Sequence, residues 1–390
     1  MLLFVLLCSG WFFFIWITTP RNVPRKLAAQ TTNLPPVVVA TEPKPLPVVR
    51  TNVYLAPKAE VLPPSLPTPV VSTSPPAVLP PSVAQLTPTS TPSLPPATAS
   101  SVSAHTYPRP VRDVAEAQIA LARFGLSSGS IDGRIGSQTR RALSAFQRLQ
   151  KLPETGELDA VTRQALLLAR APLTNYVVMH SDIARLRPVG KTWVEKSQQS
   201  ALEYETVLEL VAEKSRAHPD YVRQLNPSGA FLSPVAGASL VVPDAELDSV
   251  NPCDFIRISL AQRTLVACDV RSNVVAHFPC SIARRVEKRP AGELRVVTLA
   301  PNPNYTFNPR LFPESPEARQ LEVKLILPPG PNNPVGVAWI GLDKPGYGIH
   351  GTPVPEQVGR TESHGCFRLA NWNAEHLLKI VRTGIPVYVE

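Results

Sequence analysis

Apolar residues between positions 111 and 171 recur every three to four residues, which is the period of an α-helix. Gly125 interrupts the first run and predicts its end, because glycine commonly follows the last helical turn. Asp159 stands where its carboxylate can cap the N-terminus of a third run. The apolar residues of the three runs are Val114, Ala117, Leu121 and Phe124, then Ala142, Phe146 and Leu149, then Val161, Ala165 and Leu168. The pattern predicts a small three-helix bundle.

Residues 174–244 have a mixed pattern. A helix is predicted from Glu205 to Lys214, and a second short helix ends near Leu225. The apolar run that closes at Pro243 predicts a strand. The order of strand, helix, helix and strand predicts a small α/β module, into which residues 185–199 are inserted.

From residue 253 to residue 390 the pattern changes to short runs of Val, Ile, Leu and Phe separated by turn residues, which is typical of strands. The first three runs predict an antiparallel meander, and Asn373–Thr383 is predicted as the one helix. The predicted strands are Phe255–Leu260, Arg263–Cys268, Val274–Cys280, Arg295–Leu299, Leu321–Leu327, Val335–Ile340 and Val387–Val389. The chain is therefore expected to be a multidomain α+β protein with a β-rich C-terminal domain.

The N-terminal residues 1–19 are almost wholly apolar, which predicts a signal peptide or a membrane anchor. The run is shorter than the roughly 20 residues of a typical span, and Arg21 follows it where a signal has its basic residues in front. We therefore expect the natural start to lie upstream. Residues 20–110 are rich in proline, with 20 prolines and no glycine after position 30, which predicts a disordered linker.

The formal net charge of +9 favours an anionic partner. No segment combines a dense Lys/Arg patch with aromatic residues, so the partner is expected to be the cell envelope and not nucleic acid. Five cysteines do not make a disulfide framework. If Cys366 stays free, at most one bridge can form among Cys253, Cys268 and Cys280, and their spacing does not show which.

Two short segments carry the candidate chemistry, one around His350 and the other running from Ser363 to Leu369. A catalytic cysteine needs a base, donors for the oxyanion, and a backbone that lets the acyl group approach closely. His350 can act as the base, the amides near Gly365 and Cys366 as donors, and Gly365 leaves room for the substrate. A zinc site formed by His350, His364 and Cys366 is the alternative, but His-x-Cys is not a usual ligand spacing.

Together the segments Ile349-His350-Gly351-Thr352 and Ser363-His364-Gly365-Cys366 resemble the signature of the YkuD-type L,D-transpeptidases. The resemblance extends over about 255–390 and implies a β-rich catalytic domain that needs no cofactor and no metal. It implies a nucleophilic Cys366, a base at His350 oriented by the Gly351 carbonyl, oxyanion support from His364 and Gly365, and substrate contacts by Arg368 and Ser363.

The two preceding domains also resemble wall-associated modules. The run from Ile131-Asp132-Gly133 to Thr155-Gly156-Glu157-Leu158-Asp159 is similar to the three-helix peptidoglycan-binding domain, over residues 111–171. Residues 174–244 resemble a LysM module, which binds N-acetylglucosamine chains, but the insertion at 185–199 departs from that pattern. A structural spacer is the alternative for this module.

The resemblance implies acyl transfer on peptidoglycan, in which Cys366 forms a thioester with a stem tetrapeptide and passes it to an amine. The expected partners are stem peptides, glycan and an amine of another stem or of a wall-anchored protein. Such an enzyme would work in cell-wall biogenesis and cell shape, in the periplasmic or extracytoplasmic envelope, tethered by the N-terminal segment. Two alternatives remain open: an L,D-carboxypeptidase with the same site, and a non-catalytic peptidoglycan-binding protein.

Overall fold

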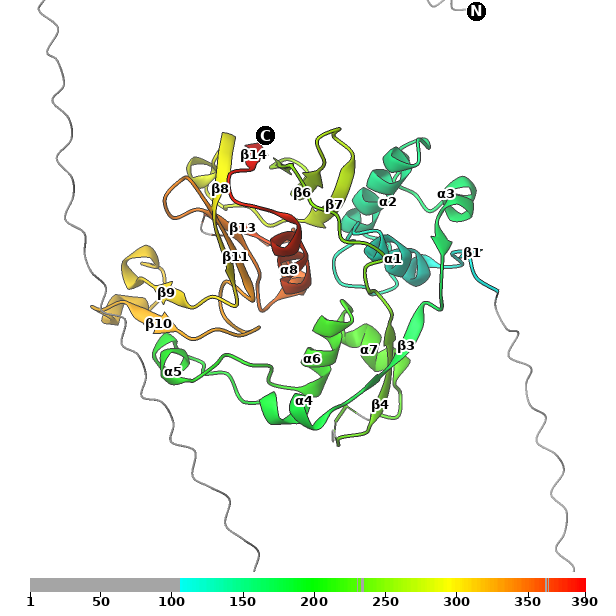
Figure 1. Cartoon of the computed structure of the whole chain (residues 1–390). Coiled ribbons are helices and arrows are strands. Elements are labelled where there is room, and N and C mark those ends of the chain that lie inside the picture. Colours follow the sequence, from blue (N-terminus) through cyan, green and yellow to red (C-terminus); the bar gives the residue numbers. More distant parts are fainter. Residues whose placement is uncertain (1–105, 230, 233–234, 362, 364) are drawn as a thin grey trace, which may run out of the picture. The chain divides into compact units, whose positions relative to one another are not determined.

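The computed structural model describes residues 106–390 except positions 230, 233, 234, 362 and 364 (Figure 1). The predicted anchor at 1–19 and nearly all of the predicted linker at 20–110 lie outside the described residues. Among the residues that are described, no helix has the length and apolar character needed to cross a membrane.

The predicted three-helix bundle forms, and Asp159 caps its third helix as predicted. Asp113 and Asp159 each accept a hydrogen bond from a backbone N–H in the first turn of the helix that follows. Leu168 was predicted on the third helix, but that helix ends at Ala165 and Leu168 is buried in a short strand. The elements are β1 (Arg109–Pro110), α1 (Val114–Arg123), α2 (Ser137–Leu149), α3 (Ala160–Ala165) and β2 (Leu167–Leu168), with β1 and β2 antiparallel.

The second module has the predicted strand, two helices and closing strand, with the two strands paired antiparallel, and an additional helix, α4, that was not predicted. The amide of Asn226 fixes the pairing of helix and strand, because it bonds to both Val222 O and the backbone of Val241 at 2.8 Å. The insertion at 185–199 forms a helix of its own, α5. The elements are β3 (Leu173–Val177), α4 (His180–Arg185), α5 (Trp193–Gln198), α6 (Val207–Lys214), α7 (Pro219–Leu225) and β4 (Ser239–Pro243).

The C-terminal domain is built on a mixed sheet whose strand order is β13-β12-β11-β8-β14-β5-β6-β7. The predicted meander is confirmed, since β5, β6 and β7 pair antiparallel in sequence order. The strands are β5 (Phe255–Ser259), β6 (Thr264–Cys268), β7 (Val274–Pro279), β8 (Gly292–Pro301), β11 (Ala338–Leu342), β12 (Gly348–His350), β13 (Phe367–Arg368) and β14 (Pro386–Val389).

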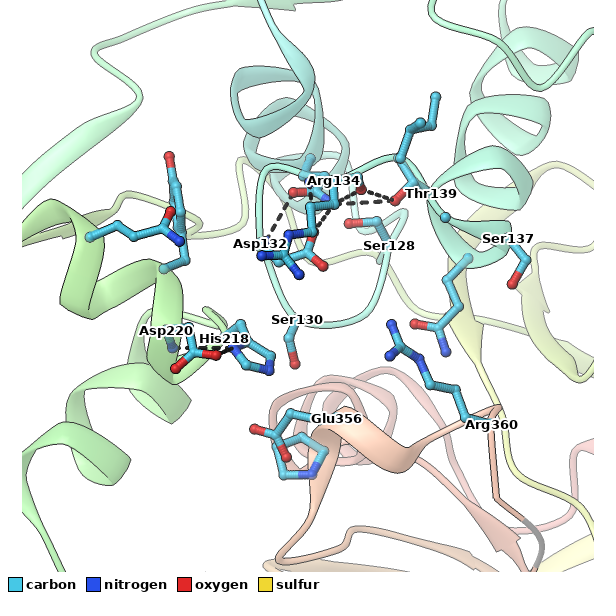
Figure 2. A pocket seen from close by; sticks show the side chains of 17 residues that line it. Ser128, Ser130, Asp132, Arg134, Ser137, Thr139, His218, Asp220, Glu356 and Arg360 are labelled. Carbon is cyan, nitrogen blue, oxygen red and sulfur yellow. Dashed lines mark hydrogen bonds and ion pairs between the residues drawn. The ribbon is translucent and has the colours of Figure 1, made fainter.

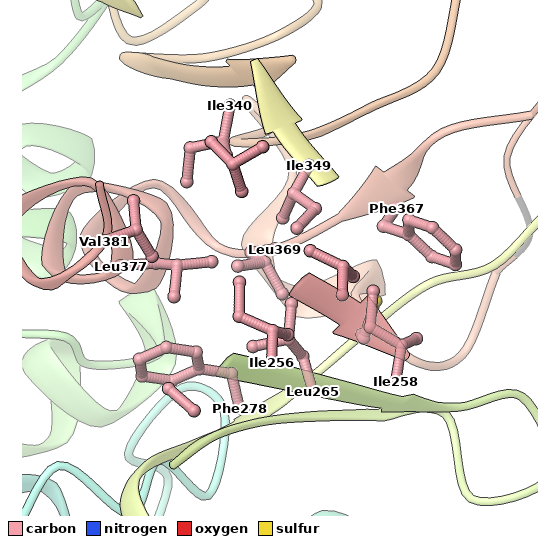
Figure 3. Packing of buried hydrophobic residues seen from close by; sticks show 14 of the residues in the cluster. Ile256, Ile258, Leu265, Phe278, Ile340, Ile349, Phe367, Leu369, Leu377 and Val381 are labelled. Atoms are coloured by element: carbon pink, nitrogen blue, oxygen red, sulfur yellow. The ribbon is translucent and has the colours of Figure 1, made fainter. Parts of the chain in front are cut away.

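Helix α8 (Asn371–Ile380) packs its apolar residues against this sheet. Figure 3 shows Leu377 and Val381 meeting Ile256, Leu369 and Phe278 in one buried cluster. The helix begins two residues earlier and ends three residues earlier than predicted. Four cysteines are among the described residues, and all four are free thiols.

A second pair of strands, β9 (Tyr305–Phe307) and β10 (Leu325–Leu327), forms a separate antiparallel hairpin. The segment between them holds the short 3-10 helices η2 (Pro309–Leu311) and η3 (Ala318–Gln320). Leu321 to Lys324 were predicted as part of a strand, but only Leu325–Leu327 pair. Residues 302–337 thus make a flap outside the main sheet, which is called the flap below.

Candidate active site

The pairing of β12 with β13 places the predicted nucleophile and base on one face of the sheet. These strands run parallel, with Ile349 opposite Phe367 and His350 opposite Arg368. Ile349 and Phe367 are fully buried in the core. Because successive side chains of a strand point to opposite faces, His350 and Cys366 both lie on the other face, as diagonal neighbours.

The turn before Cys366 is held by the side chain of Ser363. Its hydroxyl donates to the carbonyl of Cys366 at 2.5 Å and accepts the N–H of Gly365 at 3.3 Å. The Ser363 N–H donates to Ile282 O at 2.8 Å, which ties the turn to the chain after β7. Ser363 is only 6% exposed, so its hydroxyl is committed to the turn. His364 lies outside the described residues.

His350 has the protonation state that a general base requires. Its Nδ1 lies 2.6 Å from the Gly351 carbonyl. Since a carbonyl can only accept, Nδ1 carries the hydrogen and Nε2 is left to take a proton. Burial lowers the pKa of His350 to about 4, with the Gly351 carbonyl opposing the shift, so the ring is neutral at pH 7. The indole of Trp339 stacks on the imidazole, 5.6 Å between ring centroids.

Cys366 rests as a thiol. Its Sγ donates to the Gly346 carbonyl at 3.4 Å. Burial raises the pKa of the Cys366 thiol, while the Gly348 N–H and the Arg368 guanidinium oppose that shift. The site is therefore a neutral thiol and a neutral imidazole at rest.

Gly348 allows the strand carrying His350 to approach Trp339. A Cβ at Gly348 would lie 2.5 Å from the indole ring, closer than atoms can pack. Any side chain here would displace either Trp339 or the strand, and with it the N–H that faces Cys366. Close approach, and not an unusual backbone angle, explains glycine at this position.

Asn371, the first residue of α8, fixes the turn after His350. Its Oδ1 accepts the Thr352 N–H at 3.0 Å, and its Nδ2 donates to the Pro331 carbonyl at 3.1 Å. A Cβ at Gly351 would lie 2.2 Å from the same Oδ1. The carbonyl that orients His350 is therefore placed by an amide on the next helix, a support that sequence analysis did not find.

A carboxylate from the second module completes this support. Glu213 of α6 accepts from Asn371 Nδ2 at 3.0 Å and from the Tyr204 hydroxyl at 2.9 Å. Burial raises the pKa of Glu213 to about 7, and the two hydrogen bonds only partly offset that effect. No sequence motif identified Glu213 as a residue of the site, because its hydrogen-bond partner Asn371 is distant in the chain.

The flap approaches Cys366 through Tyr305. Burial raises the pKa of Tyr305 to about 12, and the Cys366 sulfur adds to the shift, so the phenol lies within electrostatic reach of that sulfur. Behind it, Trp193 of α5 stacks on Phe307 with 4.2 Å between ring centroids. Glu317 of the flap also accepts the Trp193 N–H at 3.0 Å. The insertion of the second module thus holds the flap.

A basic cavity of about 330 Å³ opens beside the Ser363 turn. It is lined by Arg284, Arg285 and Lys288, together with Glu314 of the flap. The excess of cationic groups suits a ligand that carries carboxylates.

Two family models match this chain. The family model described as "L,D-transpeptidase catalytic domain" matches residues 254–389, and the model described as "Putative peptidoglycan binding domain" matches residues 111–166. The chain is therefore an enzyme with an L,D-transpeptidase catalytic domain of the YkuD family. Ahead of this domain it carries a peptidoglycan binding domain.

Two curated relatives are named as putative L,D-transpeptidases. The "Putative L,D-transpeptidase YkuD" of Bacillus licheniformis is 29% identical over 184 residues, which is 47% of this chain and 92% of that protein. Its namesake in Bacillus subtilis is 28% identical, over 43% of this chain and 82% of that protein. Among solved structures, L,D-transpeptidase 3 from Mycobacterium tuberculosis with a faropenem-derived adduct is 18% identical, with a TM-score of 0.29 over 40% of this chain and 76% of that one.

Proposed function

We propose that the enzyme transfers peptidoglycan stem peptides through a thioester on Cys366. The Cys366 sulfur attacks the carbonyl carbon between the third residue of a stem tetrapeptide and its terminal D-Ala. The thiol proton passes to Nε2 of His350, and D-Ala leaves with that proton on its amine. An acceptor amine then attacks the thioester, gives its proton to His350, and the thiol forms again as the amide product leaves.

The observation that carries this proposal is the arrangement of His350. Its Nδ1 is fixed on the Gly351 carbonyl and its ring is neutral, so Nε2 is ready to accept a proton. It shares one face of the sheet with Cys366. A thiol that is protonated at rest needs such a base.

The other predicted site residues take supporting roles. We propose that the Cys366 amide, with His364 and Gly365, holds the oxyanion. The N–H of Gly365 would exchange its long bond to Ser363 for this purpose. Arg368 and the cavity of Arg284 and Arg285 would bind substrate carboxylates. The buried Ser363 hydroxyl supports a positioning role more than direct contact with the substrate.

The acceptor is an amine of another stem or of a wall-anchored protein, and the role is cell-wall biogenesis and cell shape. The work would take place outside the cytoplasm, with residues 1–19 as a tether. Transfer to water, the L,D-carboxypeptidase reaction, uses the same residues. The second module would act as a LysM-like element, in which the insertion serves the flap.

Products from defined substrate test the proposal. The full chain is incubated with a disaccharide-tetrapeptide, and the masses of the soluble products are measured by mass spectrometry. A crosslinked dimer that has lost one D-Ala is expected, with Cys366→Ala as the inactive control. If only disaccharide-tripeptide forms, the acceptor is water and the hydrolytic alternative holds. If neither product forms, the proposed reaction is wrong.

A further inference from the structure

A second cavity, of about 300 Å³, lies away from the residues that form the candidate active site (Figure 2). Three parts of the chain line it. The first is 128–139, which is the loop between α1 and α2 with the first turn of α2, together with Gln118 of α1. The second is α7 with its N-cap at 218–224, and the third is the segment 355–360. The third segment contains η4 (Pro355–Gln357) and lies between the His350 turn and the Ser363 turn in sequence.

Hydrogen bonds between the modules fix the walls of this cavity. Ile131 N donates to Arg216 O and His218 N donates to Ile131 O, both at 2.8 Å. From α2, the Gln138 amide donates to Val358 O at 2.5 Å. All three parts are thus held before any ligand arrives, which reduces the entropic cost of binding.

Two serine hydroxyls in this cavity have no hydrogen-bond partner among the described residues. Ser128 is 4% exposed and its Oγ is buried, and the Oγ of Ser130 is buried as well. Figure 2 shows Ser130 directed into the space between Arg134 and Glu356. Buried polar groups are nearly always satisfied, so unpartnered hydroxyls in a cavity indicate a polar ligand or water.

Opposite charges face each other across the cavity without pairing. Arg134 and Arg360 lie on its walls with Glu356, and none of the three forms an ion pair with another described residue. The other two carboxylates in the lining have partners, since Asp220 pairs with Arg223 and Asp132 accepts from the Gln118 amide. In Figure 2 the guanidinium of Arg360 and the carboxylate of Glu356 project from one segment in different directions. A ligand that offers both a carboxylate and an ammonium group would satisfy them.

We propose that this cavity binds a peptidoglycan stem peptide through the free carboxylate and free amine of its diamino acid. Arg360 and Arg134 hold the carboxylate, Glu356 holds the ammonium group, and the two serine hydroxyls bond to the peptide backbone. The site is separate from the proposed catalytic residues, and binding there holds the peptidoglycan close to them. This inference rests on the proposed function, because it takes the same polymer as ligand.

A neutral glycan fits this cavity less well. The bound sugar would displace water from Arg360 and Glu356, and its uncharged hydroxyls would not replace the interactions that these charges make with water. The charges of the cavity therefore favour a stem peptide over a glycan chain as its ligand. The experiment below compares the two.

The test is calorimetric titration of the full chain carrying Cys366→Ala, so that no probe is consumed. The probes are a synthetic stem tripeptide ending in the diamino acid, and the N-acetylglucosamine tetramer. The tripeptide should bind, and Arg360→Ala and Glu356→Gln should each weaken it about tenfold or more. Arg271→Ala removes the same charge from an exposed turn and should change nothing.

Two outcomes overturn the proposal. One is tripeptide affinity unchanged in both cavity variants, and the other is loss of tetramer binding in those variants without any effect on the tripeptide. The resemblance to YkuD-type L,D-transpeptidases implies that carbapenems acylate Cys366. The same substitutions in the chain that retains Cys366 should form this carbapenem adduct at the wild-type rate, which shows that the fold and active site are intact. Absence of that adduct in the wild type would instead count against the thioester mechanism.

Discussion

The two strands that position the proposed nucleophile and base differ from the flap in what holds them. Strands β12 and β13 belong to the main sheet, and their inward residues Ile349 and Phe367 are buried in the core of the catalytic domain. The flap lies outside that sheet, and its aromatic residues pack with Trp193 and Leu202 of the second module. The chemistry is thus built into one domain, while the segment near the nucleophile depends on its neighbour.

This difference means that the reactivity of Cys366 and the access of substrate to it should respond to different substitutions. A substitution on the β12–β13 face should change acylation by every substrate or inhibitor. A substitution in the packing between flap and insertion should affect large substrates more than small ones, because only large substrates need a well-placed flap. The predictions below follow that division, from the largest effect to the smallest.

Cys366→Ala should reduce acylation to the background level and leave the fold intact, because the small thiol beside Gly365 contributes little packing. Intact-protein mass spectrometry with a carbapenem measures the adduct, and thermal melting measures the fold. A melting temperature lowered by many degrees would show that the thiol is structural, and persistent adduct would show that another residue is the nucleophile.

His350→Ala should slow acylation about 100-fold or more, the usual range for loss of a general base. In the wild type, the pKa of His350 at about 4 means that the neutral form dominates above pH 5. The rate should therefore fall as pH drops from 5 through 4, as the ring gains a proton. Stopped-flow acylation from pH 4 to pH 8 measures this, and a fall centred near pH 6.5 would contradict the burial argument.

Trp193→Ala should raise the KM for a disaccharide-tetrapeptide about fivefold while leaving carbapenem acylation within about twofold of the wild type. The stacking of Trp193 on Phe307 contributes about 1 kcal/mol in addition to the burial of apolar area, and this energy corresponds to about a fivefold change in KM. Trp193→Phe keeps a ring in place and is the matched control. Equal slowing with both reagents would mean that the insertion supports the catalytic strands as well.

Glu213→Gln should act chiefly on the pH dependence of stability. The pKa of Glu213 is raised to about 7 in the folded state, so the folded protein binds more protons than the unfolded chain between about pH 4.5 and pH 7. The wild type should lose stability as pH rises through that window, and the variant should lose less. Melting temperatures at pH 5 and pH 8 decide this, since parallel curves would show that Glu213 is charged throughout.

Much of the site follows from sequence, because local motifs carry it. His350 and Cys366 were predicted from residue type and spacing, and Gly351 from the resemblance to a family, while the register of β12 and β13 places His350 and Cys366 on one face. Strands β12 and β13 were not predicted, because runs of three and two residues are too short to show a period.

The supports were missed for a different reason. Asn371 and Glu213 are 158 positions apart in the chain, and neither stands in a motif. Helix α5 has six residues and packs against the flap from another module, so its pattern appeared only as an insertion. Interactions between modules depend on tertiary packing, which a single sequence does not encode in its local period.

The most direct test of the account is the covalent intermediate itself. The full chain is mixed with a disaccharide-tetrapeptide, quenched in acid within seconds, and mapped by mass spectrometry after proteolysis. The account predicts the mass of the substrate minus D-Ala, attached to the peptide that contains Cys366 and released by hydroxylamine, as a thioester should be. The same mass on a serine, or crosslinked product with no acylated Cys366 at any time point, would contradict it.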